Sequence, residues 1–135
     1  MDTNALFQQA VAARRNSYIP YSHFAVGACL LTTDGTMFVG CNVENASYGG
    51  TICAERVAFC QALAQGYRDF EAIAIVGGKG DDLQFCPPCG ICRQFMTEFC
   101  DPDRFKVVLY LPDGTPKVYT LAQLLPLQFT DKDVL

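Results

Sequence analysis

Apolar residues recur along the chain with two spacings, one typical of helices and one typical of strands. Helical spacing, with capping residues and glycine or proline stops, predicts helices at residues 3–16, 53–65, 89–99 and 121–125. Apolar runs bounded by turn residues predict strands at residues 25–32, 37–43, 71–78, 105–111 and 117–120. The pattern therefore predicts an α/β fold, a three-layer α/β/α domain with a mixed five-stranded sheet.

Turn signals and one apolar run predict how these strands are arranged. Asp-Gly pairs at residues 34–35 and 113–114 are hairpin signals, so the strands on either side should pair antiparallel. The run E-A-I-A-I-V-G-G at residues 71–78 is almost continuously apolar, which favours a central strand buried on both faces. Residues 79–88 are expected to form a polar loop. The first helix is expected to pack on the sheet, without a chemical role.

Composition and charge narrow the choice of function. A chain of 135 residues with 50% apolar residues is enough for one domain, so residues 1–135 are interpreted as a single domain. The formal charge of -4 gives no broad basic surface, which argues against a nucleic acid polymer as partner and favours a small uncharged substrate. Neither an export signal nor an apolar run of membrane-spanning length is evident, so we expect a cytoplasmic protein without membrane contact.

Eight cysteines without an export signal favour metal binding over disulfide bonds. Cys53 lies in the motif C-A-E-R, and Cys89 and Cys92 lie in the motif P-C-G-I-C. Three thiolates could hold one zinc ion and leave its fourth position for water, which distinguishes a catalytic site from a closed structural one. Glu55 stands two residues after Cys53, where a carboxylate could move protons to and from that water.

The predicted elements bring the two motifs to the same end of the sheet. A helix that starts at Cys53 runs roughly 20 Å outward, and the strand that follows runs a similar distance back. Cys89 and Cys92 then share one face of the next helix, so that two helix N-termini point at the metal. Arg56 and Arg93 could also withdraw charge from the sulfurs, although for Arg93 an exposed ion pair is an equal alternative.

The remaining cysteines have several interpretations. Cys86 forms C-P-P-C with Cys89, which leaves open a redox pair or a metal-ligand pair that replaces Cys89 and Cys92. The other four lie among apolar residues and are predicted to be small core residues, namely Cys29, Cys41, Cys60 and Cys100.

Three further side chains could contact a substrate. Asn42 and Glu44 stand two apart at a strand end, so their side chains point to one face and could converge on a polar ligand. A solvated pair is the alternative. Phe24 could contact a ligand or be only the first core residue of its strand, and Glu55 could be an ordinary first-turn glutamate.

C-A-E-R at residues 53–56, followed by P-C-G-I-C-R-Q at residues 88–94, resembles the small three-cysteine cytidine deaminases of pyrimidine salvage. The resemblance covers nearly the whole chain. Further matching segments are P-Y-S at residues 20–22, N-V-E-N at residues 42–45 and L-L-P at residues 124–126. Pro87 and Ile91 depart from the family pattern, in which serine and alanine are commoner.

This resemblance implies a homotetrameric enzyme with one Zn²⁺ per chain, held by Cys53, Cys89 and Cys92. It implies that Glu55 is the catalytic proton carrier. The implied substrate contacts are Phe24 on the pyrimidine ring, Asn42 and Glu44 on the ribose hydroxyls, and also Ala54, Tyr48 and Phe129, the last from a neighbouring subunit. Arg56 is implied to hydrogen-bond the zinc-bound sulfurs.

The expected function is zinc-dependent hydrolytic deamination of cytidine and 2′-deoxycytidine to uridine and 2′-deoxyuridine, with release of ammonia. One alternative is a deaminase of another cytosine-containing nucleoside or a nucleoside antibiotic. A polymer-editing deaminase is disfavoured by the acidic balance of the chain. A zinc-stabilised module without catalysis is disfavoured by Glu55, because a structural site needs no proton carrier.

Overall fold

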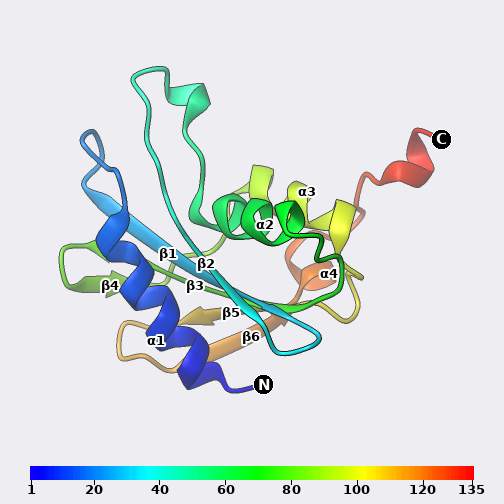
Figure 1. Cartoon of the computed structure of the whole chain (residues 1–135), viewed down its shortest axis with the longest axis horizontal. Helices are drawn as coiled ribbons and strands as arrows, with labels where there is room; N and C mark the ends of the chain where they lie inside the picture. The colour runs from blue at the N-terminus through cyan, green and yellow to red at the C-terminus, as the bar shows by residue number, and fades with distance from the viewer.

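A mixed six-stranded β-sheet crosses the middle of the molecule (Figure 1). The computed structural model describes residues 1–135. The strands are β1 (Phe24–Thr32), β2 (Met37–Cys41), β3 (Phe70–Lys79), β4 (Asp82–Gln84), β5 (Lys106–Tyr110) and β6 (Pro116–Thr120). Five strands follow the order β2-β1-β3-β5-β6, and β4 pairs with β3 beside this path. β3 and β5 are parallel, and all other pairs are antiparallel.

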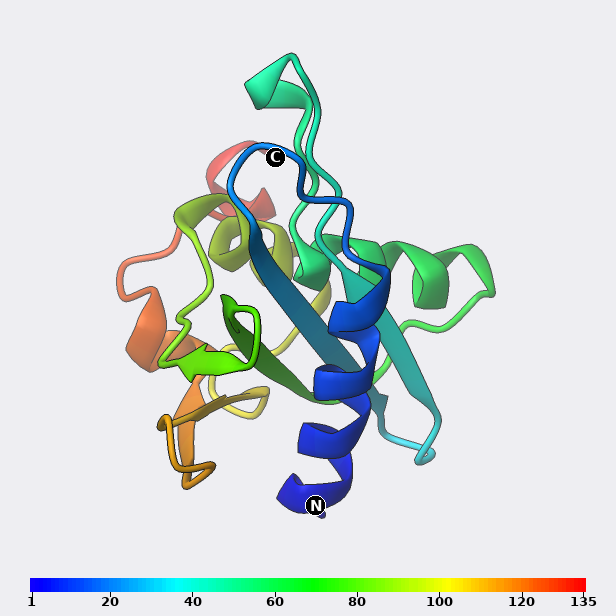
Figure 2. The same cartoon turned by 90° about the vertical axis from the view of Figure 1, so that its left-hand side faces the viewer.

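Helices cover both faces of this sheet (Figures 1 and 2). They are α1 (Thr3–Ala13), α2 (Ala54–Ala64), α3 (Gly90–Phe99) and α4 (Leu121–Leu124). α1 packs on one face, whereas α2 and α3 pack on the other, so the predicted three-layer α/β/α class is confirmed. None of the helices has the length and apolar character needed to cross a membrane.

Strand β1 shows why both faces need a helical layer. Ala28 and Leu30 belong to the core beneath α2 and α3, whereas Cys29 and Leu31 belong to the core beneath α1. Successive side chains of a strand point to opposite faces, so β1 contributes to both cores. Full burial of one leucine side chain stabilises the fold by about 1.5–3 kcal/mol, so apolar contacts hold both layers on the sheet.

The sheet has one strand more than the five predicted. β4 lies in the segment predicted to be a loop and pairs with the end of β3 after a turn at Gly80, where φ is 56°. Its three residues, D-L-Q, are too few to show a strand pattern, so only their backbone pairing reveals it. β2 ends earlier than predicted, at Cys41. Cys60 is exposed, which corrects its prediction as a core residue.

The chain between β2 and α2 projects from the body of the molecule as an arm (Figure 1). Its two limbs are joined by a pair of backbone hydrogen bonds between Val43 and Ile52, each 2.9 Å long. At the base of the arm, a Cβ on Gly40 would collide with the backbone of Ala54 and Ala58. The absence of that Cβ lets the first turn of α2 lie directly on β2.

Candidate active site

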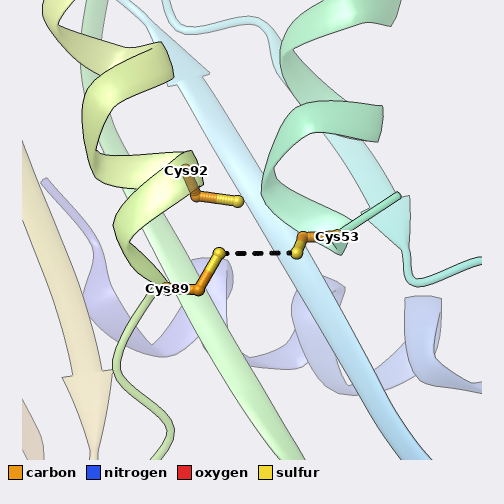
Figure 3. Close-up of side chains that lie close together, drawn as sticks. All are labelled: Cys53, Cys89 and Cys92. Atoms are coloured by element: carbon orange, nitrogen blue, oxygen red, sulfur yellow. Dashed lines mark hydrogen bonds between the residues drawn. The ribbon is translucent and has the colours of Figure 1, made fainter. Parts of the chain in front are cut away.

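Three cysteine sulfurs converge between the first turns of α2 and α3 (Figure 3). Cys53 is the N-cap residue of α2, Cys89 is the N-cap residue of α3, and Cys92 lies in the first turn of α3. Their ligand atoms all lie within 4.8 Å of one another. The structure therefore brings together the three cysteines that the two sequence motifs contain.

The spacing of these sulfurs suits a zinc ion. Tetrahedral zinc with Zn–S bonds of about 2.3 Å places two sulfur ligands about 3.8 Å apart. The Sγ atoms of Cys53 and Cys89 are 3.7 Å apart, which agrees with that geometry. Cys86 is not a member of the cluster, so the ligand pair that would use Cys86 is not formed.

The surroundings of Cys53 favour its thiolate form. Hydrogen bonding from the Cys92 thiol, followed by that from Arg56 and Cys89, outweighs burial and lowers the pKa of Cys53 to about 5. The Arg56 Nη2 atom lies 3.5 Å from Cys53 Sγ and 3.4 Å from the Thr51 carbonyl oxygen. Arg56 therefore contacts a sulfur of the cluster, where its charge and the N-terminus of α2 both favour a bound anion.

Glu55 is a buried carboxyl beside this cluster. It lies in the first turn of α2 with only 4% of its surface exposed. Burial raises its pKa to about 7, the negative charge of Cys53 adds to that effect, and hydrogen bonding with its own backbone opposes it. A carboxyl group that titrates near neutral pH can both accept and donate a proton, which is what general acid-base catalysis requires.

Two adjoining hollows form a pocket in front of the cysteine cluster. The inner hollow, about 170 Å³, is lined by Val26, Asn42, Thr51, Cys53, Ala54, Glu55, Cys86, Pro87 and Cys89. The outer hollow, about 310 Å³, is lined by Tyr21, Ser22, Glu44, Tyr48 and Thr51. Thr51 lines both, so the hollows are neighbours. Thr51 carried no signal in the sequence, whereas Tyr21 and Ser22 belong to the matching segment P-Y-S.

Asn42 and Glu44 both bind the chain that leads into β1. The Asn42 Nδ2 atom donates to the Phe24 carbonyl at 2.8 Å, and its Oδ1 atom accepts from the Val26 amide at 3.0 Å. The Glu44 Oε1 atom accepts from the amides of Tyr21 and Ser22 at 3.0 and 3.1 Å. The Glu44 carboxylate also lines the outer hollow, where it can accept a hydrogen bond from a ligand.

Phe24 and Cys86 lie side by side over Gly77 of β3. A Cβ on Gly77 would come within 2.7 Å of Cys86 Sγ and 2.9 Å of Phe24 Cε1. Burial raises the pKa of Cys86 to about 11, so its thiol is protonated at neutral pH, which does not suit the redox interpretation. Cys86 therefore contributes a neutral side chain to the pocket wall.

The remaining predicted residues lie at different distances from the pocket. Ala54 is fully buried and lines the inner hollow, and Tyr48 is 73% exposed on the arm. Phe129 is 61% exposed in the C-terminal segment and lines neither hollow.

Arg93 forms no ion pair, and donates instead to the carbonyl oxygens of Pro88 and Leu124 at 2.8 and 2.6 Å. Arg93 thus joins the cysteine loop to α4.

A three-cysteine centre with a buried glutamate at the edge of an α/β/α sheet is the arrangement of the zinc-dependent nucleobase deaminases. The family model described as "Cytidine and deoxycytidylate deaminase zinc-binding region" matches residues 1–109. The chain belongs to this family of hydrolytic zinc enzymes.

Individual relatives match the chain along nearly its whole length. The cytidine deaminase of Halalkalibacterium halodurans is 47% identical over 99% of this chain and 98% of its own length. The cytidine deaminase of Sporosarcina psychrophila is 42% identical over 99% of this chain and 96% of its own length. A crystal structure of the Burkholderia pseudomallei cytidine deaminase superposes with a TM-score of 0.87 at 50% identity, covering 96% of this chain and 100% of that one.

Proposed function

We propose that this protein catalyses the hydrolytic deamination of cytidine and 2′-deoxycytidine to uridine and 2′-deoxyuridine. The observation that carries the proposal is the buried Glu55 carboxyl, which lines the same pocket as two of the three clustered cysteines. Water and the nucleoside are consumed, and the keto product and ammonia are formed. This activity fits the family to which the chain belongs.

We propose that Cys53, Cys89 and Cys92 hold one zinc ion per chain. Bound zinc would lower the pKa of a water molecule and so supply the hydroxide that attacks C4 of the cytosine ring. Glu55 accepts the proton that this water loses and delivers it to N3 of the ring. In a second transfer Glu55 takes the proton of the hydroxyl group now on C4 and passes it to the exocyclic nitrogen; the C4–N bond then breaks, ammonia leaves and the C4 keto group forms.

The ligand set can be tested by elemental analysis of single variants. We expect Cys53→Ala, Cys89→Ala and Cys92→Ala each to lose zinc and activity. Cys86→Ala is the matched control, and it should keep its zinc, because Cys86 lies outside the cluster. Full zinc in Cys89→Ala together with loss of zinc in Cys86→Ala would show that the wrong pair has been assigned.

The outer hollow supports a ribose subsite. The Glu44 carboxylate lines that hollow and can accept a further hydrogen bond, and Asn42, in the adjoining inner hollow, keeps one N–H and one lone pair beyond its bonds to β1. Phe24 lies beside the wall residue Cys86, and from there it would contact the ring. The lining of both hollows contains carboxylates and no lysine or arginine, which favours a nucleoside over a phosphorylated deoxycytidylate.

We also propose a homotetramer that works in the cytoplasm as a single-domain enzyme. Leu127 and Phe129 are exposed in the C-terminal segment, and Tyr48 is exposed on the arm beside the outer hollow. Aromatic and aliphatic side chains left exposed in this way favour burial against another copy of the chain. In this assembly Phe129 of one chain closes the pocket of a neighbour.

The direct test is an ultraviolet assay of the zinc-loaded protein with a substrate panel. The panel consists of cytidine, 2′-deoxycytidine, deoxycytidylate, cytosine, a cytosine-bearing nucleoside antibiotic and a single-stranded oligonucleotide. We expect turnover of the first two. Turnover restricted to the antibiotic or to the oligonucleotide would refute the proposed substrate, and zinc binding without any turnover would support a structural module.

A further inference from the structure

Arg14, directly after α1, reaches across the sheet face that lies opposite the active site. Its Nε atom donates to the Ala25 carbonyl oxygen at 2.9 Å. Its Nη2 atom donates to the carbonyl oxygens of Gly78 and Gly80 at 2.9 and 2.8 Å. One guanidinium therefore joins the beginning of β1 to the end of β3 and the turn that leads into β4.

The surroundings of Arg14 commit it to these carbonyl groups. The chain contains a single ion pair, Arg104 with Asp101, so the half-buried Arg14 has no carboxylate partner. Its aliphatic stem lies against Gly27 of β1, where an added Cβ would be 3.0 Å from Arg14 Cγ. Hydrogen bonds from a charged donor are stronger than those between neutral groups, and the planar guanidinium fixes the directions of all three.

The backbone held by Arg14 carries the pocket wall on its other face. In the β1–β3 register Ala25 pairs with Gly78, and the next pair, Val26 with Gly77, lies on the opposite side of the sheet. Val26 lines the inner hollow, and Gly77 supports the Phe24 ring and Cys86. Figure 2 shows α1 on the near side of β1, with α2 and α3 on the far side.

The electrostatics agree with this close relation. Burial is the main cause of the raised pKa of Cys86, the negative charges of Glu55 and Cys53 add to it, and the positive charge of Arg14 opposes it. Gly77, next to the Gly78 carbonyl that Arg14 holds, lies directly beneath the wall residue Cys86.

We propose that Arg14 is a positioning residue, which fixes the backbone of β1 and the β3–β4 turn and thereby sets the positions of the wall residues Val26 and Cys86 and of Phe24 beside Cys86. Arg14 does not touch the substrate. The inference rests on the proposed function, in which this pocket holds a pyrimidine nucleoside. A misplaced wall weakens contacts with the ring but leaves the cysteine cluster and Glu55 in place.

The test compares Arg14→Lys and Arg14→Gln with the wild type in steady-state assays with cytidine and by elemental analysis. Lysine keeps the charge, but its single nitrogen cannot hold three carbonyl groups in the arginine geometry. We expect both variants to keep full zinc, with KM raised about tenfold and kcat changed much less. Arg15→Gln is the matched control, because Arg15 is exposed and makes no side-chain hydrogen bond, and it should leave KM unchanged.

Two further variants separate positioning from general stability. Leu6→Val loosens the packing of α1, since Leu6 is fully buried in the core beneath that helix, but leaves the Arg14 bonds intact. It should lower Tm without raising KM. In the Phe24→Leu background, Arg14→Gln should raise KM much less than it does in the wild type, because both changes act on the same contact.

The outcomes distinguish this inference from the proposed function. If the wild type deaminates cytidine and KM is unchanged in both Arg14 variants, the role of Arg14 is refuted and the proposed function stands. A KM in Leu6→Val that rises as much as in Arg14→Lys would likewise reduce Arg14 to a stabilising residue. Zinc-loaded wild type that fails to deaminate any nucleoside would overturn the proposed function and the role of Arg14 with it.

Discussion

Two residues of one helical turn, Cys53 and Glu55, have opposite electrostatic environments. Cys53 receives hydrogen bonds and lies beside Arg56, so its pKa falls to about 5. Glu55 is turned into the protein interior, so burial raises its pKa to about 7. Near neutral pH the first is therefore ready to bind a cation, while the second can exchange a proton. This division of roles follows from the two-residue spacing within C-A-E-R.

Replacement of Glu55 by glutamine should separate metal binding from catalysis. Glutamine preserves the shape and hydrogen bonding of the side chain but cannot carry a proton. We expect Glu55→Gln to keep full zinc occupancy, with kcat reduced by a factor at or beyond the top of the range of about 10² to 10⁴ that is typical of general acid-base groups. Glu98→Gln, on an exposed position of α3, is the control and should be fully active. Retention of more than about a tenth of normal turnover would exclude Glu55 as the proton carrier.

The buried Cys29 thiol should make the folded protein less stable at alkaline pH. Burial raises the pKa of its thiol to about 11 from an ordinary value of 9.0. Because the unfolded chain ionises first, the stability due to the neutral thiol is complete below pH 9 and is lost as the pH rises through about 11. Over this interval, Tm should fall less steeply in Cys29→Ala than in the wild type. Cys60→Ala, at an exposed position, should follow the wild type, and identical curves for all three proteins would contradict the expectation.

At the scale of the elements, the sequence predicts best those strands and turns that have a distinctive local pattern of residues. The apolar run at residues 71–78 lies within β3, which is buried and central as predicted. Both Asp-Gly turns place the glycine at positive φ, 91° at Gly35 and 90° at Gly114. β4 was missed because it is defined by backbone pairing rather than by side-chain pattern.

In the candidate site, too, residues in local motifs could be predicted from the sequence, whereas contacts between distant residues could not. Its cysteines and Glu55 stand in short motifs at helix starts, so local sequence was enough to group them. The bonds of Arg14, the double use of Asn42 and the position of Thr51 between two hollows depend on residues distant in sequence. No local periodicity contains such contacts, because they arise only when the sheet register is set.

Gly40→Ala should disturb the close packing of α2 on β2. The added Cβ would collide with the backbone of Ala54 and Ala58, which cannot move aside as a side chain can. Overpacking of this kind costs about 1–3 kcal/mol, so we expect a lower urea midpoint and reduced zinc retention. Gly49→Ala is the control, because a Cβ there meets no atom within 4 Å. Equal stability of the two variants would show that α2 does not depend on this contact.

At the scale of the whole molecule, the proposed assembly rests on the exposed C-terminal segment, which contains Phe129. Gln94 donates to the Phe129 carbonyl oxygen at 2.8 Å, so the Phe129 backbone is held on α3 while its ring remains exposed. A ring presented in this way can enter the pocket of a neighbouring copy. The exposed Tyr48 on the arm would lie at the same junction.

Phe129→Ala should therefore raise KM for cytidine while zinc stays bound. Activity of the wild type should also fall on dilution below the dissociation constant of the assembly, since the pocket would then lose its closing ring. Light scattering combined with a dilution series measures both. Thr130→Ala is a neighbouring control that should leave KM unchanged. A fully active monomer would rule out a pocket completed by another chain.

The placement of the cysteines at the starts of two different helices has a mechanical consequence. The proposed ligands Cys53 and Cys89 are 36 positions apart in the chain, so an ion held between them would act as a removable cross-link that closes a long loop. The same ion would thereby join α2 to α3, and the loop so closed contains β3, the central strand. A chelator would then remove a cross-link between two segments on either side of β3, and α2 and α3 would separate before the sheet unfolds.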